Sequence, residues 1–121
     1  MKFQDLEQFT NDDVEAAIIR NDPEELQFVP VTIALTSSDP SYAQEVCIKL
    51  AVHGDNKVRG NAIISLGHIA RRFRRLNEHE VKPIIESALT DADENVRVLA
   101  KSAADEIHQF LGWAIAGHVY G

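Results

Sequence analysis

A stretch of sixteen residues, Asp55 to Ala70, constrains the fold of this chain more than any other feature, because a weaker copy of it begins thirty-eight residues later, at Asp93. Residues of the same type stand at corresponding places in the two copies: Asp55 and Asp93, Val58 and Val96, Arg59 and Arg97, Ala62 and Ala100, and Ile69 and Ile107. Self-similarity at a period of about 20 to 50 residues is the sequence signature of a repeat architecture. The chain is therefore predicted to form a solenoid, in which each repeat packs mainly against its neighbours.

Apolar residues recur at helical spacing through most of the chain, and turn residues separate the segments. Helices are expected over about 11–20, 23–37, 40–53, 56–75 and 78–90, and from the 91–93 turn to about 111. Pro30 lies inside the second of these segments and lacks an amide hydrogen, which predicts a kink or a break near Phe28. No alternation of Val, Ile and Thr is bounded by turn residues, so the expected fold class is all-α.

The size and composition of the chain indicate one domain. It has 121 residues, of which 45% are apolar, enough for a continuous core. A single cysteine, Cys47, excludes an internal disulfide framework and favours a reducing compartment. Neither a signal peptide nor a run of about 20 apolar residues is present, so we expect no contact with a membrane and a cytoplasmic location.

The net charge of −7 is distributed unevenly along the chain. Residues 1–55 contain 11 acidic and 3 basic side chains, whereas residues 56–121 contain 8 acidic and 9 basic ones. A concentrated negative charge attracts cationic surfaces and repels nucleic acid. The asymmetry therefore favours a basic protein partner.

The segment from Val81 to Arg97, followed by Ala100 and by Ala103 and Ala104, resembles the HEAT repeat pattern. The features that carry the resemblance are a proline early in the first helix, an Asp-x-Asp turn and a Val-Arg pair that opens the second helix. The middle unit is similar through Asp55, Val58, Arg59, Ala62 and Leu66. Residues 28–40 share only the proline and the turn, and residues 1–22 and the tail lie outside the pattern.

The resemblance implies a single HEAT-like domain, residues 1–121, built as a short right-handed α-solenoid. It implies about three antiparallel helix pairs, at about 11–37, 40–75 and 78–111, with residues 112–121 as a C-terminal cap. It also implies that Asp55, Arg59, Asp93 and Arg97 have a structural role, because in this family the turn aspartate and the Val-Arg arginine commonly link successive repeats.

Two groups of residues are candidate partner-binding surfaces. Six acidic residues fall within fourteen positions: Asp12, Asp13, Glu15, Asp22, Glu24 and Glu25. A polar stripe recurs at helical spacing along the fourth helix, through Asn61, Ser65, His68 and Arg72. In HEAT-like stacks such second helices commonly line the concave face, although simple solvent exposure explains the stripe equally well.

Other functions have weaker support in the sequence. Arg71, Arg72, Arg74 and Arg75 form a basic cluster that suits phosphate groups, but cations at a helix C-terminus are also favoured by its dipole. No two histidines lie one turn apart, as a zinc site on a helix requires, and Cys47 lies on an apolar helix face. We therefore expect no metal, no cofactor and no enzymatic activity.

The leading interpretation is a protein-binding module. In size and acidity the chain is similar to small bacterial HEAT-like immunity proteins, which implies occlusion of a basic toxin domain such as a nuclease. The alternatives are a scaffold or adaptor subunit of a larger complex and, third, a HEAT-like enzyme or a nucleic-acid binder.

Overall fold

The computed structural model describes residues 10–120, and in this range it contains seven α-helices and no strand. The all-α prediction is confirmed. The helices are α1 (Asn11–Arg20), α2 (Pro23–Leu26), α3 (Val29–Thr36), α4 (Pro40–Leu50), α5 (Asn56–Phe73), α6 (Glu78–Ala88) and α7 (Glu94–Leu111).

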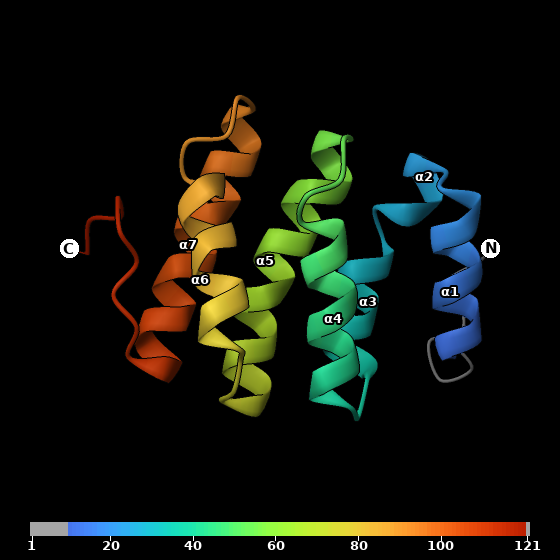
Figure 1. The fold of residues 1–121 in the computed structure, drawn as a ribbon, viewed down its shortest axis with the longest axis horizontal. Helices are drawn as coiled ribbons and strands as arrows, with labels where there is room; N and C mark the ends of the chain where they lie inside the picture. Colours follow the sequence, from blue (N-terminus) through green and yellow to red (C-terminus); the bar gives the residue numbers. More distant parts are fainter. Residues whose placement is uncertain (1–9, 121) are drawn as a thin grey trace.

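The helices stack in chain order in two layers (Figure 1). α4 and α6 lie in front of α3, α5 and α7, while α1 and α2 stand at the N-terminal end of the stack and the tail covers the other end. α5 is the central element, because α3, α4, α6 and α7 all contact it. Its most extensive contact is with α7.

Polar side chains set the beginnings of the helices. Asp39, Asp55 and Asp93 are N-caps whose carboxylates accept from free backbone amides of α4, α5 and α7. Such a cap typically contributes about 1 kcal/mol. α7 ends at Gly112, which adopts the left-handed conformation (φ 75°) that a helix C-terminus favours.

The expected break near Phe28 is observed. α2 ends at Leu26 and α3 begins at Val29, with Pro30 in the first turn of α3, where its missing amide hydrogen costs no helical bond. Because of this break, α3 is short. It spans only 8 residues, whereas α5 and α7 span 18 each.

Two glycines let α5 approach α7 closely. A Cβ atom built at Gly67 would lie 3.1 Å from the Cα of Ala103, and one built at Gly60 would lie 2.9 Å from Cδ1 of Leu99. The first neighbour is backbone, whereas the second is the end of a flexible side chain. Gly67 therefore sets the separation of the two helices, and Gly60 does not.

We expect Gly67→Ala to lower the free energy of unfolding by about 1–2 kcal/mol, because the added methyl pushes α5 away from α7. Gly60→Ala is the matched control. The terminal atoms of Leu99 can move, and alanine gains helix propensity, so this variant should be nearly neutral. Urea unfolding of both variants measures the difference; equal stability of the two would contradict the role of Gly67.

The C-terminal tail packs on α6 and α7. Ile115 is buried, the amide of Ala116 donates to Glu86 Oε2 at 2.9 Å, and the His118 ring lies 2.7 Å from Asp105 Oδ1. Tyr120 joins this segment by stacking near His108, with ring centroids 4.2 Å apart. The tail therefore covers apolar surface at the end of the stack.

The expected cap function of the tail can be tested by deletion. Removing residues 113–121 exposes the surface under Ile115, and burying one such side chain is worth about 1.5–3 kcal/mol. We expect the truncated chain to lose about 2 kcal/mol and to become less soluble. Thermal unfolding at several protein concentrations checks both effects, and an unchanged melting temperature would rule out a cap.

Candidate partner-binding surfaces

The first acidic group lies where α1 meets α4. The Tyr42 hydroxyl on α4 donates to Glu15 Oε2 at 2.5 Å and joins the two helices. Burial raises the pKa of Tyr42 above its ordinary value, and the hydrogen bond to Glu15 and the nearby charges of Glu45 and Asp12 raise it further. The three carboxylates Asp12, Glu15 and Glu45 are exposed, so this surface carries negative charge into solvent.

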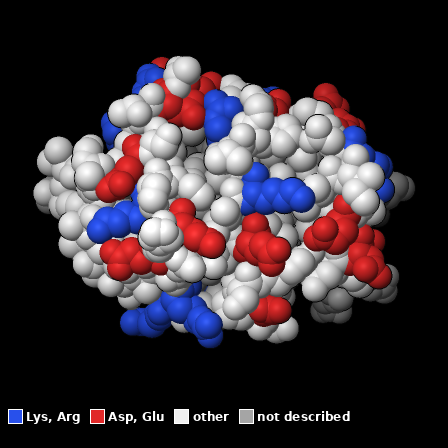
Figure 2. All heavy atoms as spheres, viewed as in Figure 1, with Lys and Arg blue, Asp and Glu red and all other residues white. Residues whose placement is uncertain are grey.

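The second acidic group lies at α2, at the other end of α1. Asp22 caps α2 by accepting from the amide of Glu24, and Glu25 forms an ion pair with Arg20 at 2.9 Å. The six candidate acids, which lie within fourteen positions of the sequence, therefore form two groups in the structure. Asp12, Asp13 and Glu15 lie in the first half of α1, whose 10 residues span about 15 Å, and the α2 group follows its other end. Figure 2 shows acidic side chains gathered at the right of the view, over both ends of α1.

Within the acidic set, only some residues are available to a partner. Asp13 and Thr10 form a capping box at the start of α1, and Asp22 and Glu25 have the contacts described above. Asp12 and Glu24 are exposed, and their carboxylates have no hydrogen-bond partner among residues 10–120. These two side chains, together with Glu45 on α4, are the free charges of this end of the molecule.

The polar stripe of α5 faces α3 more than solvent. Asn61 Nδ2 donates to the Gln27 carbonyl at 2.8 Å, and Arg72 Nη1 donates to the carbonyls of Ala34 and Ser37 at the end of α3. Ser65 is fully buried and donates to the Asn61 carbonyl at 2.6 Å. The expectation that Ser65 contacts a partner is corrected by its burial, and Asn61 and Arg72 have roles inside the fold.

His68, the remaining residue of the stripe, belongs to a small cluster between α5 and α7, and its side chain is 21% exposed. Arg71 Nη1 donates to Glu106 Oε1 at 3.1 Å, and His68 Nδ1 lies 3.9 Å from Glu106 Oε2. Partial burial lowers the pKa of His68, which the Glu106 charge partly offsets and the Arg71 charge reinforces. Together these effects favour the neutral form of the His68 ring.

The α3 segment and α7 carry exposed apolar side chains that the polar stripe did not reveal. Phe28, Leu35 and Val98 are each about half exposed, at 52%, 49% and 51%. Phe28 and Leu35 lie two turns apart and share one face of the α3 segment. Helical periodicity shows which residues share a face of a helix, but it does not show how exposed that face is.

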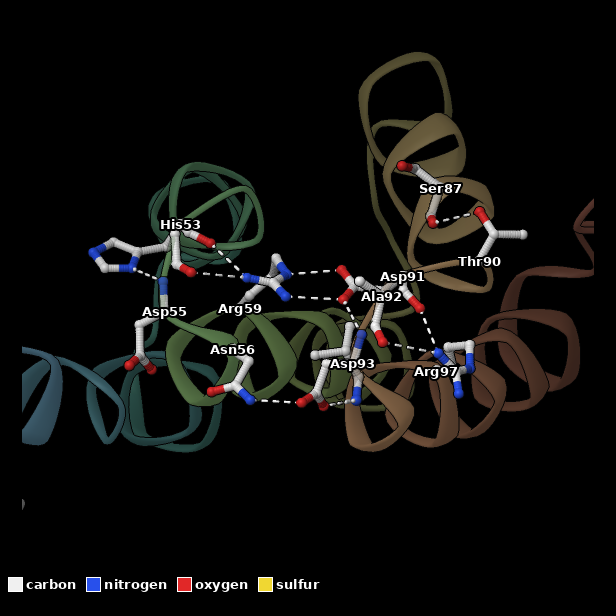
Figure 3. A network of polar contacts seen from close by, with 12 residues as sticks. His53, Asp55, Asn56, Arg59, Ser87, Thr90, Asp91, Ala92, Asp93 and Arg97 are labelled. Atoms are coloured by element: carbon white, nitrogen blue, oxygen red, sulfur yellow. Dashed lines mark hydrogen bonds and ion pairs between the residues drawn. The ribbon is translucent and has the colours of Figure 1, made fainter.

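The turn residues between repeats form a connected network (Figure 3). Arg59 makes a bidentate contact with Asp91, at 2.7 and 2.8 Å, and also donates to the carbonyls of His53 and Gly54. Its partner is Asp91 rather than Asp93, whose carboxylate accepts from Asn56 and from the amide of Val96. The arginine therefore ties one turn to the next, and the second aspartate caps the helix.

Three of the four clustered arginines have contacts within the chain. Arg71 pairs with Glu106, Arg72 holds the end of α3, and the Arg74 guanidinium lies 5.3 Å from the centre of the Phe110 ring on α7. Arg75 has no such partner among the described residues. The four arginines therefore differ in their availability to a partner. Figure 2 shows basic side chains at the lower edge of the view, below the end of α5 in Figure 1.

The described residues form neither a metal centre nor an activated thiol. No group of three or more His, Cys, Asp or Glu side chains in the range 10–120 is placed to hold a metal ion. Cys47 is buried beneath the Pro30 carbonyl, and burial raises the pKa of its thiol. No helix in the same range is long and apolar enough to cross a membrane.

No family model matches the sequence, and no curated protein matches it. A solved structure is similar in fold, namely the crystal structure of a CDI complex from Cupriavidus taiwanensis LMG 19424. The similarity covers 91% of this chain and 97% of that chain, with a TM-score of 0.73 and 22% sequence identity. The two chains share one fold over nearly their whole length.

Proposed function

We propose that this chain is a protein-binding inhibitor, an immunity protein that neutralises a basic toxin domain by occluding its working surface, and that it is not an enzyme. The observation that carries the proposal is its fold, which 91% of this chain shares with a chain of a CDI complex. At 22% identity the toxin itself need not be the same.

The charge distribution supports a basic partner. Asp12, Glu24 and Glu45 are exposed and unpaired among the described residues, and they lie on α1, α2 and α4, in the acidic N-terminal half of the chain. Complementary charge accelerates association and suppresses wrong partners. Toxins that cleave nucleic acid carry basic substrate clefts, so an acidic surface can cover such a cleft without any chemistry of its own.

The half-exposed apolar side chains supply a second element of an interface. Specific interfaces contain buried apolar anchors surrounded by a polar rim. Phe28 and Leu35 lie on the α3 segment, next in sequence to the acidic α2. An interface that spans α1 to α3 would therefore combine charge with apolar contact.

Growth protection tests the proposal. A candidate toxin domain, chosen from the genes that neighbour the gene of this chain, is expressed in a sensitive host, with and without the chain. We expect the chain to restore growth and to copurify with the toxin in a fixed ratio. Absence of both protection and copurification would refute the proposal.

The control uses a variant that keeps the fold and lacks the apolar contact. Phe28→Ser together with Leu35→Ser should retain the helical signal and melting behaviour but weaken copurification. The matched control, Val52→Ser, changes another exposed apolar residue, 72% exposed, in the turn after α4. It should protect the host as well as the unmodified chain does.

A further inference from the structure

A polar cavity of about 310 Å³ lies between the beginning of α4 and the segment that joins α5 to α6. It is lined by Pro40, Ser41, Gln44, Arg75, Leu76 and Asn77. No carboxylate is among these residues, although the chain as a whole is acidic. We propose that this cavity binds a single carboxylate, an Asp or Glu side chain of the protein partner.

The lining residues offer unused hydrogen-bond donors. The Arg75 side chain has no ion-pair or hydrogen-bond partner among residues 10–120, in contrast to Arg71 and Arg72, and it lies over no aromatic ring, in contrast to Arg74. The Ser41 hydroxyl has no hydrogen-bond partner in the same range. The side-chain oxygen of Gln44 accepts from the Asn77 amide, which leaves its NH₂ group free to donate. An arginine fork flanked by a hydroxyl and an amide matches the geometry of a carboxylate.

The side chains, and not the helix end, would hold the anion. Asp39 already accepts from the backbone amides of Ser41 and Tyr42, so the first turn of α4 is capped from within the chain. The guanidinium of Arg75 supplies the positive charge, because the pocket lining contains no other charged group.

An isolated carboxylate fits this site better than the backbone of a nucleic acid. Binding to nucleic acid is built from many phosphate contacts, and the neighbouring arginines are held by other parts of the fold. The neighbouring Tyr42 of α4 donates to Glu15, with Asp12 and Glu45 nearby, and these charges repel a polyanion. The inference rests on the proposed function, because it names the chemistry of one contact with that partner. The partner would place an acidic side chain opposite Arg75 and basic side chains opposite α1.

Titration with acetate as the probe tests the cavity without the toxin. In ¹H–¹⁵N spectra of the full chain at constant ionic strength, acetate should shift the amides of Ser41, Gln44, Leu76 and Asn77 saturably. Arg75→Gln should weaken this binding about tenfold, whereas Arg74→Gln, which removes the same charge beside Phe110, should leave it unchanged. Shifts that do not saturate, or that are equal in Arg75→Gln, would overturn the proposal.

Two further experiments decide whether the anion that occupies the cavity comes from a protein or from a nucleic acid. A short duplex DNA that displaces acetate at lower concentration would overturn the protein partner in favour of nucleic acid. With the toxin in hand, Arg75→Gln should raise the dissociation constant of the complex about tenfold, and Arg74→Gln should not. An unchanged constant in Arg75→Gln would remove the carboxylate contact while protection by the unmodified chain still stood, so the two proposals can fail separately.

Discussion

We expect Arg59→Ala to lower the free energy of unfolding by about 3 kcal/mol, and the melting temperature by about 10 °C. The Arg59 side chain is 20% exposed and that of Asp91 is 15% exposed, so both charges are largely withdrawn from water. Truncating one partner leaves the other partly buried and unpaired, and it also leaves the carbonyls of His53 and Gly54 without a donor. Urea unfolding measures the loss.

Arg97→Ala is the matched control for this prediction. Arg97 stands at the corresponding place one repeat later and donates to the carbonyls of Asp91 and Ala92, but it has no carboxylate partner among the described residues. We expect a loss of about 1–1.5 kcal/mol, the value of ordinary hydrogen bonds. If the two variants lost equal stability, the bidentate contact would not be the source of the difference.

Because of the ion pair between Arg59 and Asp91, the stability of the fold should fall as the pH is lowered. The hydrogen bonds from Arg59 hold the pKa of Asp91 below its ordinary value. A carboxyl whose pKa is lower in the folded state stabilises the fold above its unfolded pKa of about 3.9, and this contribution is lost as pH falls. Acid unfolding of Arg59→Ala should therefore show a weaker loss of stability below about pH 4 than the unmodified chain.

Helical periodicity correctly predicted the all-α class, and the missing amide hydrogen of Pro30 correctly predicted the break near Phe28, because both depend on local properties of the backbone. It did not identify Asp91 as the partner of Arg59. The family resemblance implied that Asp55, Arg59, Asp93 and Arg97 link successive repeats, but the carboxylate that Arg59 binds in the following turn is that of Asp91. The separation of 32 residues reflects how two turns stack, which the pattern of one repeat does not contain.

The candidate site was predicted less well, for a related reason. Spacing places Asn61, Ser65 and Arg72 on one face of a helix, but it does not say what covers that face. In the structure α3 covers it, so Ser65 is buried and the other two bind carbonyls of the α2–α3 segment. The acidic group was likewise divided, because α1 separates residues that are close in sequence.

We expect reversal of the free acids at the N-terminal end to slow association with the toxin by about ten- to a hundredfold at low salt. The variant is Asp12→Lys with Glu45→Lys, which changes the net charge from −7 to −3. Asp13 and Glu25 are left intact, because the first caps α1 and the second pairs with Arg20. Stopped-flow binding to the toxin domain, with the unmodified chain as reference, measures the rate.

Position, and not only net charge, should determine the effect. Glu80→Lys with Glu94→Lys makes the same change of net charge at the beginnings of α6 and α7, away from α1. Because salt screens exposed charges over about 10 Å at 0.1 M, this control should slow association far less. In the unmodified chain the rate should fall steeply with ionic strength, and Asp12→Lys with Glu45→Lys should flatten that dependence. Equal rates for the two double variants would remove the surface around α1 and α4 from the interface and leave the apolar side of α3 as its centre.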